Sequence, residues 1–137
     1  MKRLCLAVAL FSAACTMGLH AQVLDEQAQI PFDFWLGHTV MPAGEYSIYH
    51  MNSGAVVVRR GGDHPTSAVF LAEPLSRNET RGEGKLQFTH YGDIYFLSRI
   101  WVAGEQNGYG VPKSHREKEF ARRGVPSLTA DVTLSSK

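Results

Sequence analysis

The sequence predicts a mainly β fold, a small antiparallel sandwich or open barrel of about six or seven strands with one short C-terminal helix. Short runs of the chain alternate apolar and polar residues, which is the pattern of half-buried strands. Glycine and proline residues that favour turns separate these runs. A helix-capping pattern occurs near the end of the chain, so the helix is expected after most of the strands.

The first strand is expected at residues 30–36, where every second residue is apolar. Pro31 has no backbone donor, so this strand begins there or runs along a sheet edge. A turn with proline and glycine at residues 41–44 predicts a hairpin, whose return strand is residues 45–51. A run of three valines indicates the next strand at residues 55–60.

The following segments predict a second hairpin. Residues 66–72 form a strand that Pro74 should end, and residues 76–84 are polar enough for a long exposed loop. Residues 85–91 and 94–102 form the clearest hairpin, and the second of these strands is apolar on both faces, as expected of a central strand. Two polar residues interrupt it, Ser98 and Arg99.

The helix is predicted from its caps. After a flexible loop at residues 104–110, Ser114 and Glu117 match a capping box, and Gly124 offers an end. The helix contains few apolar residues, so it must pack on the sheet to be stable. Residues 125–137 either add one last strand or fray.

The start of the chain predicts export. Residues 1–21 combine a basic beginning, an apolar stretch and small residues that end at Ala21, which is the pattern of a secretory signal peptide. The apolar stretch is about half of the roughly 20 residues that cross a bilayer, and we expect no transmembrane span in the mature protein. Residues 22–137 then form a single β-rich domain, secreted or periplasmic, with a tail after residue 124 that either pairs or frays.

The same segment allows a second interpretation. Small residues precede Cys15, as in the lipid-attachment signal of bacterial lipoproteins, so Cys15 would anchor the protein to the envelope. Cleavage after Ala21 would instead remove both cysteines and leave a formal charge of −1, because two of the 14 basic and none of the 13 acidic residues are lost. A near-neutral domain of this kind has no field that would attract nucleic acid.

Three parts of the mature chain carry a resemblance: residues 30–37 with residues 41–46, residues 85–101, and residues 112–114 with residues 116–119. Together they resemble a family of small, uncharacterised secreted β-rich proteins from environmental Gram-negative bacteria. The resemblance implies bacterial export and a shared β fold. It implies no activity, ligand or catalytic residue, because none is assigned to the family.

Four aromatic residues lie opposite the more apolar face of their predicted strands: Trp35, Tyr49, Tyr95 and Trp101. If they are exposed together, they form a patch that suits a polysaccharide, a peptide or an envelope protein. In a two-layer fold they are instead buried under the helix. The sequence leaves both alternatives open. It also allows the basic helix to be attracted to anionic lipid or polysaccharide.

His50 and His90 are the best candidates for a metal or a catalytic role, because each closes an apolar strand face. No second ligand stands at a close, regular spacing from either, and no cofactor is expected. The sequence also contains no Gly-x-Ser-x-Gly elbow. We therefore expect an exported, non-catalytic β domain with a binding or structural role, and keep two alternatives: a small hydrolase or metal-dependent enzyme, and a lipid-anchored protein.

Overall fold

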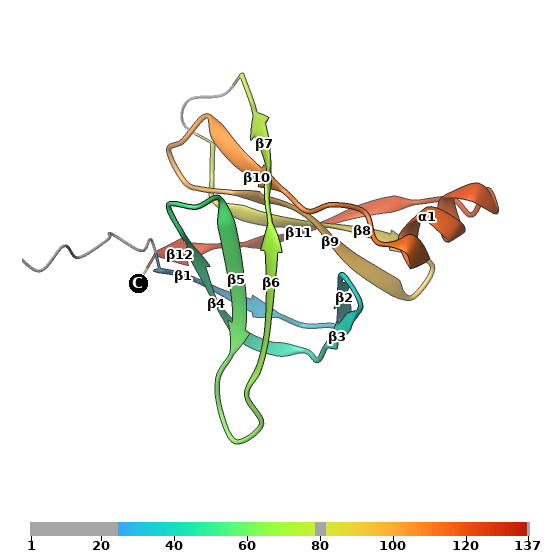
Figure 1. Cartoon of the computed structure of the whole chain (residues 1–137), viewed down its shortest axis with the longest axis horizontal. Coiled ribbons are helices and arrows are strands. Elements are labelled where there is room, and N and C mark those ends of the chain that lie inside the picture. The colour runs from blue at the N-terminus through green and yellow to red at the C-terminus, as the bar shows by residue number, and fades with distance from the viewer. Residues whose placement is uncertain (1–24, 79–81, 137) are drawn as a thin grey trace, which may run out of the picture.

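The computed structural model describes residues 25–78 and 82–136. These residues form two β-sheets, one of five and one of seven strands, and one short helix (Figure 1). The sheets do not close into a barrel. The predicted mainly β fold with one late helix is therefore confirmed.

The strands are more numerous and shorter than the sequence predicts. Their bounds, with the helix, are β1 Asp25–Ile30, β2 Phe34–Leu36, β3 Thr39–Met41, β4 Gly44–His50, β5 Ala55–Arg60, β6 Thr66–Leu71, β7 Glu73–Ser76, β8 Lys85–Tyr91, β9 Ile94–Trp101, β10 Asn107–Gly110, α1 His115–Arg122, β11 Leu128–Thr133 and β12 Ser135–Ser136.

The five-stranded sheet has the antiparallel order β12-β1-β4-β5-β6. Its strands β4, β5 and β6 lie where the sequence predicts them. Strand β1 begins in a polar segment that shows no strand pattern, and it pairs with β4 on one side and β12 on the other. The two ends of the described chain therefore lie side by side in this sheet.

The first predicted strand is divided between the two sheets, so its prediction as one strand is wrong. Ile30 ends β1, and Phe34 begins β2 in the other sheet. Between them, the carboxylate of Asp33 accepts a hydrogen bond of 2.8 Å from the amide of Ala43, which fixes the chain at the crossing. Ile30, Phe34 and Leu36 are nevertheless all buried, as their alternation predicts.

The seven-stranded sheet is organised by β9, as predicted for a central strand. Strand β8 pairs antiparallel with β9, and a β-bulge lies between Gln87 and Phe88. The other edge of β9 is shared: β2 pairs in parallel near Tyr95, and β10 pairs antiparallel near Ile100. Strand β11 lies outside β8 and β7 lies outside β10.

Two strands lie where the sequence predicts none. The strand before Pro74 ends at Leu71, but Pro74 itself lies inside a further strand, β7, which is tolerated because β7 is an edge strand and a missing donor there breaks no ladder. The predicted loop at residues 104–110 contains β10, whose glycines permit close packing against its neighbours. The tail after residue 124 pairs as β11 and β12.

The hydrophobic core lies between the two sheets. The five-stranded sheet contributes Ile30, Tyr46, Ile48, Val56 and Val58, all fully buried. Leu86, Phe88, Leu97 and Ile100 face them from the seven-stranded sheet. Because these residues alternate along their strands, the intervening residues of β8 and β9 point to the opposite, outer face of the seven-stranded sheet.

Helix α1 packs on that outer face at one end of the molecule (Figure 1). The ring of Phe120 stacks on Tyr91 at 5.5 Å and meets the edge of Phe96 at 6.1 Å. The hydroxyl of Ser114 accepts a hydrogen bond from the amide of Glu117, which is one of the two bonds of the predicted capping box; Oε1 of Glu117 is buried without a hydrogen-bond partner among the described residues. Gly124 adopts a left-handed conformation with φ of 69°, which ends the helix.

The side chain of Arg77 links two loops of the seven-stranded sheet, at the end of the sheet away from α1. Its guanidinium donates hydrogen bonds of 3.0–3.1 Å to four backbone carbonyls, those of Gly82, Glu83, Val102 and Glu105. It also lies 5.3 Å from the centre of the Trp101 ring. These carbonyls lie outside the strands, and those of Glu83 and Glu105 accept from the guanidinium, whereas those of Gly82 and Val102 also accept from a backbone amide. The guanidinium therefore stabilises the loops that lead into and out of the β8–β9 hairpin.

We expect Arg77→Lys to lower the free energy of unfolding by about 2 kcal/mol, because a single ammonium cannot reach four carbonyls that a planar guanidinium satisfies. Chemical denaturation monitored by circular dichroism measures the loss. The matched control is Arg59→Lys, at an exposed position of β5, which should leave the stability unchanged. Equal stability of the two variants would contradict this role.

Glu117 provides a pH-dependent test of the helix packing. Its carboxyl is 3% exposed, and burial raises its pKa, partly opposed by Lys113. The folded state therefore holds the proton more tightly than the unfolded state, and the stability contributed by protonated Glu117 is lost as the pH rises through the raised pKa.

Glu117→Gln should consequently be more stable than the wild type at about pH 8 and lose that advantage at about pH 4. Denaturation curves at both values measure the difference, with Glu45→Gln as an exposed control. If Glu117→Gln were less stable than the wild type by the same amount at both values, the carboxyl would be stabilised in its charged form instead.

Candidate functional site

The four aromatic residues predicted to form a binding patch are dispersed. Trp35 lies on β2, half-buried, with the guanidinium of Arg116 4.3 Å from the centre of its ring. Tyr95 lies on β9 between two rings, with Phe32 at 3.9 Å and His90 at 4.7 Å. Both ring systems are therefore already in contact with other side chains of the chain.

Trp101 is buried and has a positioning role. Its indole N–H donates a hydrogen bond of 2.8 Å to the side-chain oxygen of Gln87, and its ring covers Gly108, where a Cβ would overlap it. Tyr49 lies on β4, on the outer face of the five-stranded sheet, and is half-buried. Tyr49 and Trp101 thus belong to different sheets and do not form one patch.

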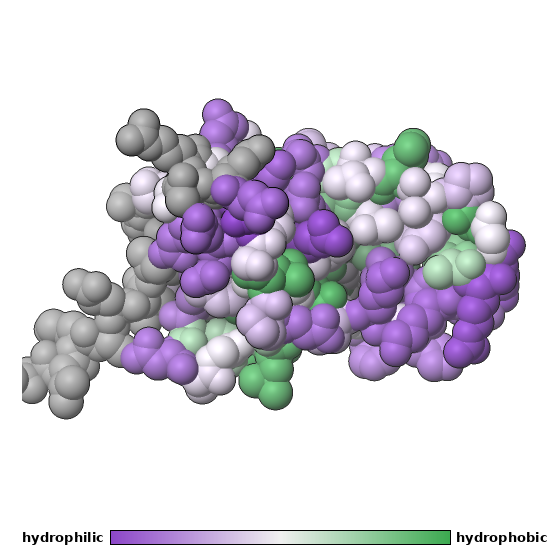
Figure 2. All heavy atoms as spheres, turned by 90° about the horizontal axis from the view of Figure 1, so that it is seen from above, coloured by the Kyte–Doolittle hydropathy of each residue, from purple (hydrophilic) through white to green (hydrophobic). Residues whose placement is uncertain are grey.

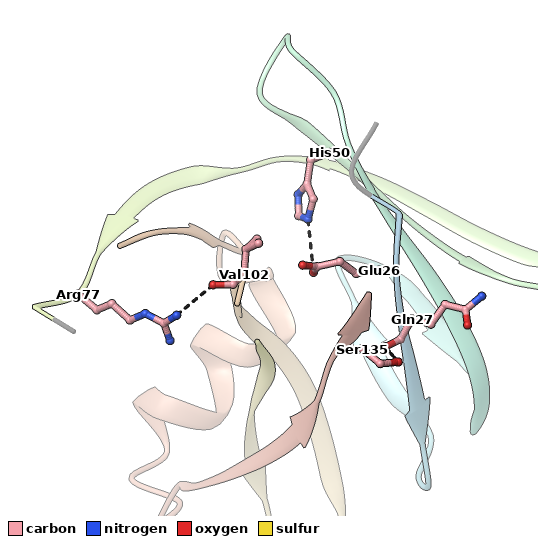
Figure 3. Close-up of polar contacts among 6 residues, drawn as sticks. All are labelled: Glu26, Gln27, His50, Arg77, Val102 and Ser135. Atoms are coloured by element: carbon pink, nitrogen blue, oxygen red, sulfur yellow. Dashed lines mark hydrogen bonds and ion pairs between the residues drawn. The ribbon is translucent and has the colours of Figure 1, made fainter. Parts of the chain in front are cut away.

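His50 lies at the buried end of β4, between the sheets. Its Nε2 lies 3.9 Å from Oε2 of Glu26 (Figure 3). Its ring stacks on Tyr109 of β10 at 4.3 Å. Both ring nitrogens of His50 and Oε2 of Glu26 are buried without a hydrogen-bond partner among the described residues. Burial, together with Glu105 and Glu26, raises the pKa of Tyr109.

His90 has a different environment, on β8 of the other sheet. Its Nδ1 lies 3.0 Å from the carbonyl oxygen of Gly92, and its ring stacks on Tyr95. The contacts of His50 and His90 are thus separate. Within residues 25–78 and 82–136, no group of three or more His, Cys, Asp or Glu side chains could hold a metal ion. Cys15 lies outside the described residues.

The largest open concavity beside α1 lies on the outer face of the seven-stranded sheet. It has a volume of about 630 Å³ and is lined by β7 to β11 and by the segment that enters α1. We call it the outer-face hollow. The residues that define it are Glu73, Thr89, Arg99, Gly110, Lys113 and Lys118.

The strand register explains why the floor of this hollow is open. Gln87, Arg99, Gly110 and Glu73 are successive partners across β8, β9, β10 and β7. Gly110 contributes no side chain to this row, and a Cβ there would lie 3.3 Å from the carbonyl oxygen of Glu73. A Cβ would also lie 3.3 Å from Cδ1 of Leu75, so the glycine allows β7 to approach β10 closely and adds no side chain of its own to the floor beside Arg99.

The polar residues of the floor are held in place by other parts of the fold. Gln87 is fixed by its hydrogen bond from Trp101. The hydroxyl of Ser98 donates a hydrogen bond of 2.9 Å to the carbonyl oxygen of Gln87, at the β-bulge. Thr89 and Thr129 are register partners on β8 and β11, so their hydroxyls lie side by side. The floor is therefore a preformed polar surface.

The charges around the hollow are mainly positive. Arg99, Lys113 and Lys118 line it, against one carboxylate, that of Glu73. Among the residues that the structure describes, none of these three cations lies within 4.0 Å of a carboxylate. The end of the molecule that carries α1 shows much hydrophilic surface (Figure 2). The lining of the hollow therefore carries net positive charge, although Lys113 also acts on the buried carboxyl of Glu117.

A second concavity, of about 550 Å³, lies on the other side of α1. It is also basic, but its cations are already engaged. Arg123 forms an ion pair of 2.6 Å with Glu119, and Arg116 lies over the ring of Trp35. The outer-face hollow is consequently the better candidate for a ligand site.

The sequence predicts only parts of this site. It predicts a basic helix region that includes Lys113 and Lys118, and it shows Arg99 as a polar interruption of an apolar strand. A charged residue in the middle of a central strand is a signal that one face of that strand is not covered. The role of Gly110 depends on the pairing of β10, which its sequence does not predict.

Comparisons with known proteins identify no relative of this chain. No family model matches the chain, and neither a curated protein nor a solved structure shows similarity to it. The resemblance to small secreted β-rich proteins of Gram-negative bacteria stays a prediction from the residues that carry it.

Proposed function

We propose that this protein is an exported, non-catalytic binding domain whose ligand occupies the outer-face hollow. The observation that carries the proposal is the convergence of three cations without ionic partners, Arg99, Lys113 and Lys118, on a preformed polar floor. Binding sites typically have volumes of roughly 300–1,000 Å³ and a few fixed polar groups, and the hollow has both.

Export is supported by the sequence of residues 1–21, which lie outside the described residues. The segment has the basic start, the short apolar stretch and the small residues of a cleaved signal peptide. Among the described residues, no helix is long and apolar enough to span a membrane. We propose that the mature domain begins at Gln22 and acts in the periplasm or outside the cell.

The site of cleavage separates this proposal from a lipid anchor. The intact mass of the protein recovered from the envelope and the medium of a Gram-negative host should correspond to a chain that begins at Gln22. A mass that begins at a lipid-modified Cys15 would show a tethered protein instead. Cys15→Ser is the matched control, because it should change the mass of the precursor but leave that of the mature chain unchanged.

Obstruction of the hollow tests the binding site. Nuclear magnetic resonance titration of the mature domain with a panel of oligosaccharides and peptides should shift signals of β8, β9, β11 and α1. Thr129→Trp, which fills the hollow from an exposed position, should abolish these shifts. Thr133→Trp, further along the same strand and outside the hollow, should preserve them. Shifts gathered around Tyr49 or His50 would contradict the proposal.

A further inference from the structure

The lining of the outer-face hollow holds three cations, Arg99, Lys113 and Lys118, against the one carboxylate of Glu73. Arg99 projects from β9, Lys113 precedes α1, and Lys118 lies within α1. Three separate elements therefore bring positive charge to one concavity, which contains a single carboxylate. Like charges that line one concavity repel one another, and a bound anion would offset this repulsion.

Resting on the proposed function, we propose that the ligand of the outer-face hollow is an acidic polysaccharide, bound through the carboxylates of its uronate units. The guanidinium of Arg99 offers a planar pair of donors that fits a carboxylate. Lys113 and Lys118 act as point charges on the opposite wall of the hollow, so that successive acidic units can each find a cation.

The remaining lining suits the hydroxyl groups of sugar rings. Gln87, Thr89, Ser127 and Thr129 provide both donors and acceptors. The aromatic ring in the lining, that of Tyr91, is stacked on Phe120 and only 5% exposed, so its face is not free to hold a sugar. Neutral sugars would therefore lose the stacking that usually holds them, whereas acidic sugars keep their charge contacts.

An acidic peptide fits the same hollow less well. Extended peptides commonly bind by adding a strand to a sheet edge, and the two edges that reach the hollow are β7 and β11. Pro74 lies in the middle of β7 and has no backbone donor to offer. The β7 edge is thus poorly suited to strand addition, and a peptide on that side would be held by side-chain contacts alone.

The test compares charged and neutral forms of the same sugars. Uronate oligomers of three types, from pectate, alginate and hyaluronate, are titrated against the mature domain by calorimetry and nuclear magnetic resonance. At least one should bind with shifts at the hollow and with an affinity that falls as salt is added. Its methyl-esterified form, in which the carboxylates are neutral, should bind at least about tenfold more weakly.

Charge-removing variants assign the effect to named residues. Arg99→Gln and Lys118→Gln should each weaken uronate binding by about tenfold, because each removes a charge-assisted contact. Arg122→Gln is the matched control, since it removes the same charge from an exposed position of α1 that does not line the hollow. Thermal unfolding confirms that the variants are folded.

Each of the other outcomes overturns a distinct claim. If the methyl esters bound at the hollow as tightly as the uronates, the proposal of an acidic ligand would be wrong, but the hollow would stand as a binding site. Tighter binding of an acidic hexapeptide at the same residues would overturn the saccharide class. Failure of all three uronate oligomers would overturn this inference, and if in addition no ligand of the wider panel shifted the hollow, the proposed function would fail with it.

Discussion

The hydrogen bonds of Arg77 set the geometry on which the candidate site depends. The guanidinium binds carbonyls from the segment before β8 and from the connection between β9 and β10. The backbone amide of Arg77 also donates to the carbonyl of Gln106. These contacts hold β7 and β10 beside β9, and so place Glu73 and Gly110 in one row with Arg99. One half-buried cation at the end of the sheet thus helps to determine the shape of the hollow on its outer face.

The two faces of the seven-stranded sheet have different chemistry for a structural reason. The inner face packs against the other sheet and is mainly apolar. On the outer face, aromatic rings are buried at both ends: Phe120 of α1 packs on Tyr91 and Phe96 at one end, and Trp101 lies at the other. Between these ends the outer face is open, and glycine, threonine and arginine line it. The hollow forms in this open part, beside α1.

The sequence predicts those parts of the fold in which alternation and burial agree. Strands β4, β5, β8 and β9 are recognisable because their apolar residues recur at every second position and face one core. Strand β1 is not recognisable in this way, because Glu26 occupies one of its inward positions and its partner, His50, comes from a later strand. Strand β10 is glycine-rich, and glycine in isolation indicates a loop. The hollow depends on both the pairing of β10 and the packing of α1 on the sheet. The alternation of apolar residues predicts neither of them.

The pairing of β1 with β12 constrains the order in which the protein folds. Glu26 lies opposite Ser136, and Gln27 lies opposite Ser135, so the first and last strands of the described chain are neighbours. Contacts between segments so distant in the chain require the closure of a long loop, which slows folding. This edge of the five-stranded sheet can therefore be completed only after Ser135 and Ser136 have been synthesised. For the export proposed above, this delay favours crossing of the membrane before the domain becomes compact.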